Sequence, residues 1–301
     1  MAAFKTLNSL ALVYINLKEY NAATFVRGLG FERNVFSYFG ITMKSTRYRL
    51  DRLLRQHTRK SPRAIRLLLV SKRIVINNQI ATDMNQLVTQ FCKVSVDGLI
   101  IQNDSPVYIV FNKPKGVVCA TKDQHHTTVI DLLDEPGKSE LHIAGRLDYN
   151  TSGLVLLTNN GNWSRRLSSP EHGVTKRYLV TVEQPLTPEY TAAFARGIYF
   201  AYENITTLPS VLHITGDFTA ELTLTEGRYH QIKRMFGAFQ NKVLALHRYA
   251  VGNLVMEGSL PPGTGRALSD LELIRIFDNA LPGTEAQLQE WVPPLTLALA
   301  T

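Results

Sequence analysis

The sequence predicts an α+β fold: a small basic domain of paired helices and short strands, then a larger domain with a mainly antiparallel central sheet. Strand-like and helix-like segments are mixed along the 301 residues, without the regular alternation of a parallel α/β protein. Apolar residues make up 45 % of the chain, enough for a globular protein with a substantial core. No apolar run reaches the roughly 18 residues of a membrane-spanning helix, so no membrane contact is expected.

The positive charge of the chain is concentrated in one short segment. The net charge is +8, yet residues 43–73 alone contain eleven Lys or Arg and a single acid, Asp51. Like charges at this density repel one another unless a polyanion neutralises them, which favours nucleic-acid binding over a merely solvated helix face. The basic residues expected to contact RNA are Arg49, Arg52, Lys60, Arg63, Arg66, Lys72 and Arg73.

This basic segment is predicted to form two short helices, and two hairpins are predicted to follow. Helical spacing marks residues 49–56 and 61–73, with Ser61 as the N-cap of the second helix and a Pro in its first turn. Alternating residues then predict strands within 74–81 and 93–101, where Asn-Asn and Asp-Gly supply the turns.

Composition suggests where the domains begin and end. With its segments "RLDRLL", "SPRAI" and "LLLVSKRIVINNQ", the stretch 43–104 resembles the S4 RNA-binding domain, whose helix pair presents Lys and Arg to RNA phosphates. The polar segment 102–106 is a predicted linker to a second domain, residues 105–278. Residues 1–42 fit this pattern poorly and are expected to be an extension dispensable for activity. Residues 279–301 lack periodicity and are expected to be a poorly ordered tail.

The second domain mixes strands with a few helices. Five segments have strand-like sequences, namely 107–114, 153–160, 177–183, 219–227 and 242–252. Helical spacing marks 187–198 and 228–240, and one apolar face of the latter segment contains Ile232, Met235, Phe236 and Phe239. Because strands and helices do not alternate regularly, the sheet is expected to be largely antiparallel.

Asp148 is the leading candidate for chemistry. It follows Gly145-Arg146-Leu147 in a turn-rich segment, and an apolar strand begins soon after it, at Gly153 or Leu154. The carboxylate is therefore expected at the lip of the sheet, partly desolvated and rigid, where nucleophile, base and metal ligand are all available roles. Capping of the turn backbone is the simpler role for this residue considered alone.

Other residues favour a catalytic role for this carboxylate. Tyr178 lies near the start of a strand, where it is available to stack on a flat substrate and offer its hydroxyl. A cation that reaches Asp148 keeps it ionised and orients it, and either Lys233 or Arg234 is placed to do so. Four basic residues crowd around the apolar stripe of segment 228–240: Arg228, His230, Lys233 and Arg234.

Several other features carry no recognisable site. His125 and His126 are adjacent, and no third ligand stands at metal-binding spacing, so they are expected to be loop histidines. The Gly-Thr-Gly at 263–265 lacks the Gly-Lys-Ser/Thr context of a phosphate-binding loop. Cys92 and Cys119 form neither a disulfide framework nor a zinc signature, which is typical of a protein from a reducing compartment.

Four motifs, taken in order, resemble the pseudouridine synthase family, in the branch of the ribosomal small-subunit enzymes. They are "NKPKGVVC" (112–119), "GRLDYNTSGLVLLTNNG" (145–161), "KRYLV" (176–180) and "EGRYHQIKRMF" (226–236). An S4-like domain ahead of the catalytic domain is also characteristic of that branch. The resemblance extends from about Met43 to Asp278.

The resemblance implies roles for the candidate residues. Asp148 matches the family's essential nucleophile or base, and Tyr178 matches a tyrosine that stacks on the flipped uracil and is a candidate for proton removal at C5. Lys233 matches the basic partner of the aspartate. Many family members have Arg at that place, so Arg234 remains the alternative partner.

The resemblance also implies contacts to RNA around the site. Arg146 matches an arginine that fills the space left by the flipped base, and Lys113 with Pro114 match a mainly structural motif. Arg228 and His230, together with Arg234, are expected to face RNA.

The implied activity is isomerisation of one uridine to pseudouridine in ribosomal RNA of the small subunit, without metal or other cofactor. The expected partner is ribosomal RNA or a pre-ribosomal particle, and a cytoplasmic monomer is expected. Large-subunit RNA is an alternative target, and a non-catalytic assembly factor is an alternative class. A glycosidase would need a second carboxylate, for which the nearby loop acids Asp131, Asp134 and Glu135 are poor candidates.

Overall fold

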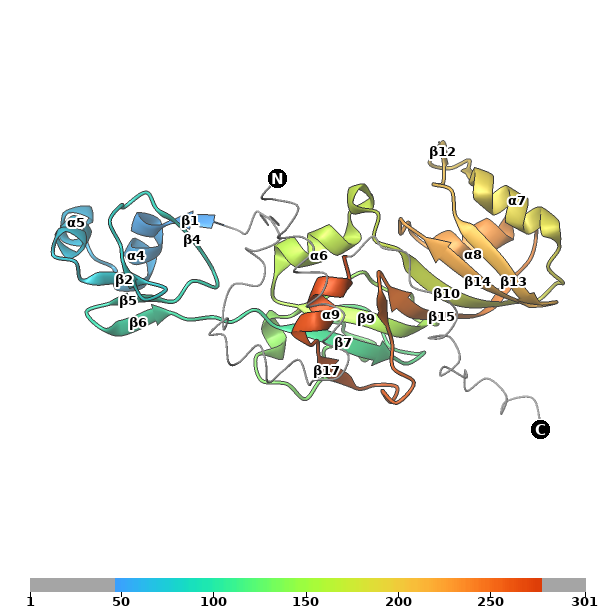
Figure 1. The fold of residues 1–301 in the computed structure, drawn as a ribbon. Coiled ribbons are helices and arrows are strands. Elements are labelled where there is room, and N and C mark those ends of the chain that lie inside the picture. The colour runs from blue at the N-terminus through green and yellow to red at the C-terminus, as the bar shows by residue number, and fades with distance from the viewer. Residues whose placement is uncertain (1–46, 278–301) are drawn as a thin grey trace, which may run out of the picture. The chain divides into compact units, whose positions relative to one another are not determined.

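The computed structural model describes residues 47–277, so the predicted extension and the predicted tail lie outside the described residues. The first part of this range folds around two helices and six short strands (Figure 1). The elements are β1 (Arg47–Arg49), α4 (Leu50–Thr58), α5 (Pro62–Val70), β2 (Ile74–Ile76), β3 (Gln79–Ile80), β4 (Leu87–Thr89), β5 (Val94–Val96) and β6 (Leu99–Gln102).

The local signals in this part act as the sequence predicts. Ser61 caps α5, since its hydroxyl accepts a hydrogen bond from the backbone N–H of Ala64 at 3.3 Å. The two turns before β3 and β6 have positive φ at both central residues, 48° and 68° at Asn77-Asn78 and 55° and 78° at Asp97-Gly98. These values define type I′ turns, whose twist suits an antiparallel hairpin. The strands pair antiparallel in the order β3-β2-β5-β6.

A separate apolar cluster stabilises this part and leaves its basic residues outside. Its fully buried members are Leu50, Leu54, Ile65, Ile74, Val88 and Val94. All seven basic residues predicted to contact RNA have exposed side chains. Two of them already have acidic neighbours, because Arg49 donates to Asp51 and Arg73 donates to Asp97.

The second part is built on a nine-stranded sheet, mostly antiparallel as expected (Figure 1). Its main path runs β13-β14-β10-β15-β9-β7-β17, while β16 pairs with β15 and β8 pairs with β9. The strands are β7 (Tyr108–Lys113), β8 (His142–Ala144), β9 (Ser152–Thr158), β10 (Lys176–Val182), β13 (Val211–Gly216), β14 (Thr219–Leu224), β15 (Val243–Val251), β16 (Leu254–Val255) and β17 (Gly265–Ala267). The helices are α6 (Gly161–Ser168), α7 (Pro188–Arg196), α8 (Gln231–Gly237) and α9 (Asp270–Arg275), and β11 (Tyr199–Phe200) pairs with β12 (Ile205–Thr206).

One parallel contact joins the two halves of this sheet. β15 and β9 pair through His247 with Ser152 and Arg248 with Gly153, whereas the other strand pairs described in this sheet are antiparallel. Gly153 has φ +110°, and a Cβ placed on it would lie 2.2 Å from the carbonyl oxygen of Arg248. Only glycine fits where these two strands meet. The loop that carries Asp148 ends just before this position.

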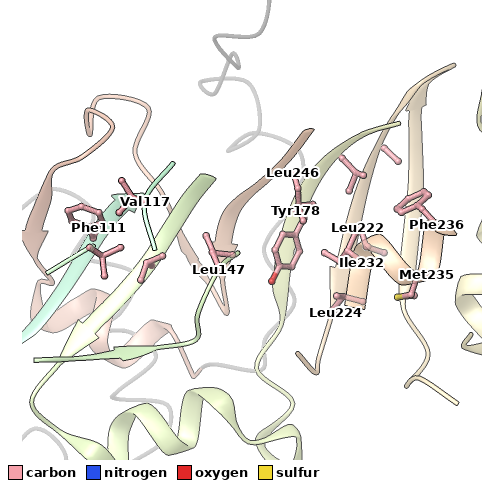
Figure 2. Packing of buried hydrophobic residues seen from close by; sticks show 14 of the residues in the cluster. Phe111, Val117, Leu147, Tyr178, Leu222, Leu224, Ile232, Met235, Phe236 and Leu246 are labelled. Carbon is pink, nitrogen blue, oxygen red and sulfur yellow. The ribbon is translucent and has the colours of Figure 1, made fainter. Parts of the chain in front are cut away.

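The main core packs on this sheet, and part of it lies against the helices α7 and α8. Ile232, Met235 and Phe236 of α8 are buried against strands of the sheet, including Leu222 of β14 (Figure 2). The apolar stripe predicted for this segment is therefore confirmed. None of the helices within residues 47–277 is long and apolar enough to cross a bilayer.

Some element bounds differ from the predictions. The helix predicted over 228–240 is shorter, because His230 is left-handed with φ 49° and α8 begins only at Gln231. The strand predicted over 219–227 ends at Leu224, where the chain turns toward α8. None of β13, α6 and α9 was predicted from the sequence.

Candidate active site

The loop between β8 and β9 presents Asp148 at the edge of the sheet. Its backbone begins with Gly145, which has φ +85°, and it closes with a hydrogen bond from Thr151 N–H to the carbonyl of Asp148 at 3.0 Å. The Asp148 carboxylate is 28 % exposed, so it is accessible to a substrate and yet partly desolvated.

A buried lysine holds one side of this loop. Lys113, at the end of β7, is fully buried, and its ammonium donates to the carbonyls of Pro114, Tyr149 and Thr151 at 2.9, 3.1 and 2.7 Å. Burial lowers the pKa of Lys113 to about 8, although nearby negative charge, including that of Asp148, favours the protonated form. Two of the three carbonyls, those of Tyr149 and Thr151, lie within three residues after Asp148, so Lys113 fixes the backbone that carries it.

A buried arginine holds the other side. Arg248 of β15 donates from Nε to the carbonyl of Leu154 at 2.8 Å and from a terminal nitrogen to the carbonyl of Gly145 at 2.7 Å. Its guanidinium also lies 6.0 Å from the ring centre of Tyr178. Sequence reasoning missed Arg248. It lies 103 positions from Gly145, and nothing in the pattern of its strand indicates that its side chain reaches the Asp148 loop.

The carboxylate of Asp148 faces two basic side chains from one segment. Lys233 Nζ donates to Oδ2 at 2.8 Å, and His230 Nε2 lies 3.6 Å from Oδ1. Both lie at the start of α8. The left-handed turn at His230 precedes this helix and brings its first residues close to the β8–β9 loop. The sequence left Lys233 and Arg234 as alternative partners of Asp148, and in the structure Lys233 makes the contact.

Arg234, the alternative partner, points elsewhere. Its guanidinium donates to both carboxylate oxygens of Glu203 and lies 3.7 Å from the ring centre of Phe200. Both neighbours belong to the β11–β12 hairpin. The geometry therefore assigns the carboxylate of Asp148 to Lys233 and gives Arg234 a role in fixing α8 to that hairpin.

Tyr178 is buried beside the site. It lies on β10 within the main apolar cluster, and Figure 2 shows its ring between Leu147, the residue before Asp148, and Leu224 with Ile232. Only 7 % of the residue is exposed, so the ring packs within the core, near the residue that precedes Asp148.

The remaining predicted residues take different positions. Arg146 has an exposed side chain in the same loop as Asp148. Arg228 donates from Nε to the buried carboxylate of Glu226 at 3.0 Å and remains 42 % exposed. Among the described residues, no three His, Cys, Asp or Glu side chains gather as metal ligands would.

The arrangement suits attack or proton transfer by a carboxylate. Lys233 donates a charge-assisted hydrogen bond to the Asp148 carboxylate at 2.8 Å, and two buried side chains hold its loop in place. The ring of Tyr178 lies near Leu147, the residue before Asp148. Such a site can act on a substrate with a single carboxylate.

Known proteins share this sequence and fold. The family model described as RNA pseudouridylate synthase matches residues 107–238. Ribosomal small subunit pseudouridine synthase A of Pseudomonas aeruginosa is 44 % identical over 229 residues, which cover 76 % of this chain and the whole of that protein. The protein of the same name from Escherichia coli strain K12 is 38 % identical over 229 residues, covering 76 % of this chain and 99 % of its own length. A crystal structure of a pseudouridylate synthase matches with a TM-score of 0.56 and 36 % identity, covering 77 % of this chain and all of the other.

Proposed function

Because the chain belongs to the pseudouridine synthase family and is an isomerase of that kind, we propose that it converts one uridine of small-subunit ribosomal RNA to pseudouridine. The proposed catalytic carboxylate is Asp148. The observation that carries this proposal is the contact between Asp148 and Lys233 at 2.8 Å, on a loop held by Lys113 and Arg248. The relatives named above support the small subunit as the source of the target.

In the proposed reaction Asp148 is the nucleophile or base. The bond between N1 of uracil and C1′ of the ribose breaks, the uracil rotates, and a bond forms between C5 and C1′. The proton leaves C5 and N1 gains one, so atoms and electrons balance without a co-reactant. Lys233 orients the carboxylate through its hydrogen bond at 2.8 Å, and Tyr178 is proposed to stack on the uracil and is the candidate for taking up the C5 proton.

The target uridine must leave its base stack to reach this site, which costs a few kcal/mol that binding has to offset. Residues 43–104 are proposed to act as an S4-like domain that supplies this affinity. Its exposed Lys and Arg would neutralise phosphates without reading sequence. Arg146 would enter the space that the extruded uridine leaves. RNA-bound Arg49 and Arg73 would exchange their present acidic neighbours for phosphates.

Mapping of pseudouridines in ribosomal RNA tests the proposal. Cells that lack the protein are expected to lose one pseudouridine from small-subunit RNA, and expression of the wild-type chain is expected to restore it. Loss of a site in large-subunit RNA instead would overturn the proposed target. An unchanged set of pseudouridines in both RNAs would overturn the proposed function. Expression of residues 43–301 in the same cells tests whether the extension is dispensable, as full restoration would be expected.

A further inference from the structure

Two aromatic rings stack beside the catalytic carboxylate. The ring centres of Tyr229 and His230 lie 3.9 Å apart, and their planes differ by 21°. His230 is the residue whose Nε2 lies 3.6 Å from Asp148. Tyr229, on the other side of the stack, is 76 % exposed. A single imidazole ring therefore separates an open aromatic surface from the reacting group.

The backbone is left-handed at this stack. His230 has φ 49° and ψ 30°, a conformation in which histidine, asparagine and aspartate are the most frequent residues after glycine. Its side chain does not cap α8. Besides placing His230 and Lys233 near Asp148, the turn brings the rings of two consecutive residues face to face.

The segment around the stack is also held firmly. The buried carboxylate of Glu226 accepts hydrogen bonds from the backbone of Leu208 at 2.9 Å, from Arg228 at 3.0 Å and from Gln231 at 2.8 Å. Gln231 in turn accepts from the N–H of Arg228 at 2.9 Å. An exposed ring on a fixed backbone loses little conformational freedom on binding, which suits it to a contact surface.

Resting on the proposed function, we propose that the Tyr229–His230 stack is a platform for the base of a nucleotide next to the target uridine. When the uridine is extruded, its neighbour loses a stacking partner, and an aromatic face compensates for that loss. The nearby Arg228 supplies positive charge for the phosphate of the same nucleotide. The contact recognises a stacked base of any sequence, because each base has an aromatic face.

Binding of matched RNAs tests this inference. The probe is the small-subunit RNA fragment around the mapped uridine, prepared intact and with an abasic site at its 5′ or its 3′ neighbour. Tyr229→Ala is expected to bind the intact fragment between about fivefold and about a hundredfold more weakly than the wild type. On one of the two abasic fragments, the wild type and Tyr229→Ala are expected to bind equally. Tyr229→Trp is expected to bind like the wild type on all three.

Phe218→Ala is the matched control. Phe218 is also an exposed aromatic residue, 45 % exposed, but it precedes β14 whereas Tyr229 follows it. The six residues of β14 place the two rings at opposite ends of a strand about 20 Å long. This variant is expected to bind all three fragments like the wild type, and equal losses in both Ala variants would overturn the inference.

The outcomes separate this inference from the proposed function. If Tyr229→Ala binds the intact fragment as the wild type does, or loses the same factor on both abasic fragments, the platform is refuted. Pseudouridine formation by the wild-type chain is measured on the same intact RNA. Its absence contradicts the proposed function, whereas normal formation with an unaffected Tyr229→Ala contradicts the platform alone.

Discussion

Replacing Gly153 by Ala is expected to separate the two halves of the sheet at the point where they support the active-site loop. The added Cβ would lie 2.2, 2.8 and 2.9 Å from the carbonyl oxygen, nitrogen and carbonyl carbon of Arg248, all of which are backbone atoms. Backbone atoms cannot move aside as the end of a flexible side chain can. Strands β9 and β15 must therefore move apart by about 1 Å, given a normal contact distance near 3.5 Å.

The free-energy cost has two parts. A side chain at φ +110° costs about 1–3 kcal/mol, and overpacking a well-packed site costs a similar amount. The expected loss in the free energy of unfolding is therefore about 4 kcal/mol. For a domain of this size it corresponds to a fall in melting temperature of roughly 10 °C. Activity should fall as well, because the backbone of Arg248 moves together with the guanidinium that holds Gly145.

Thermal unfolding and pseudouridine formation at 20 °C measure both effects. Gly161→Ala is the matched control, since no atom lies within 4 Å of its added Cβ and Gly161 is the first residue of α6. Alanine is favoured over glycine in a helix by up to about 1 kcal/mol, so this variant should be as stable as the wild type or slightly more so. A melting temperature of Gly153→Ala within about 1 °C of the wild type would refute the reasoning.

Two further predictions follow from the charges near the site. Lys233→Met should lower kcat about 10- to 100-fold, because a hydrogen bond to a charged group contributes about 1.5–3 kcal/mol. Lys233→Arg should retain most activity. Single-turnover rates of Lys233→Met that match the wild type would contradict this prediction. Burial, with a smaller effect of Lys115, lowers the pKa of His247 from 6.5 to about 4, so between about pH 4 and pH 6.5 the unfolded chain binds a proton that the folded chain does not. Stability should therefore fall by about 3 kcal/mol from this residue between pH 7 and pH 4, and urea unfolding should show a correspondingly weaker pH dependence in His247→Gln. Equal pH dependence in the two proteins would show that His247 is not the residue responsible.

Short-range features of the fold were predictable because their physical causes are local. The Ser61 cap depends on a hydroxyl three residues before a free N–H, and the Asn77-Asn78 turn depends on residues that tolerate positive φ. The helix face of Ile232, Met235 and Phe236 follows from spacing alone. Each of these signals is contained within about ten residues of sequence.

Long-range features were not predictable in this way. The hydrogen bonds of Arg248 to the Asp148 loop depend on the parallel pairing of β15 with β9, which no local pattern encodes. The choice of Lys233 over Arg234 depends on the left-handed turn at His230 and on Glu203, which attracts Arg234 from a distant hairpin. The resemblance to a family indicated the pair, and only the geometry separated the two candidates.

The central claim is that Asp148 performs the isomerisation, and a single-turnover assay tests it most directly. Asp148→Asn and the matched Asp134→Asn, which changes an exposed loop carboxylate in the same way, are compared with the wild type on small-subunit RNA. We expect Asp148→Asn to bind the RNA with nearly wild-type affinity and to form no pseudouridine, while Asp134→Asn remains fully active. Formation of pseudouridine by Asp148→Asn would contradict the account.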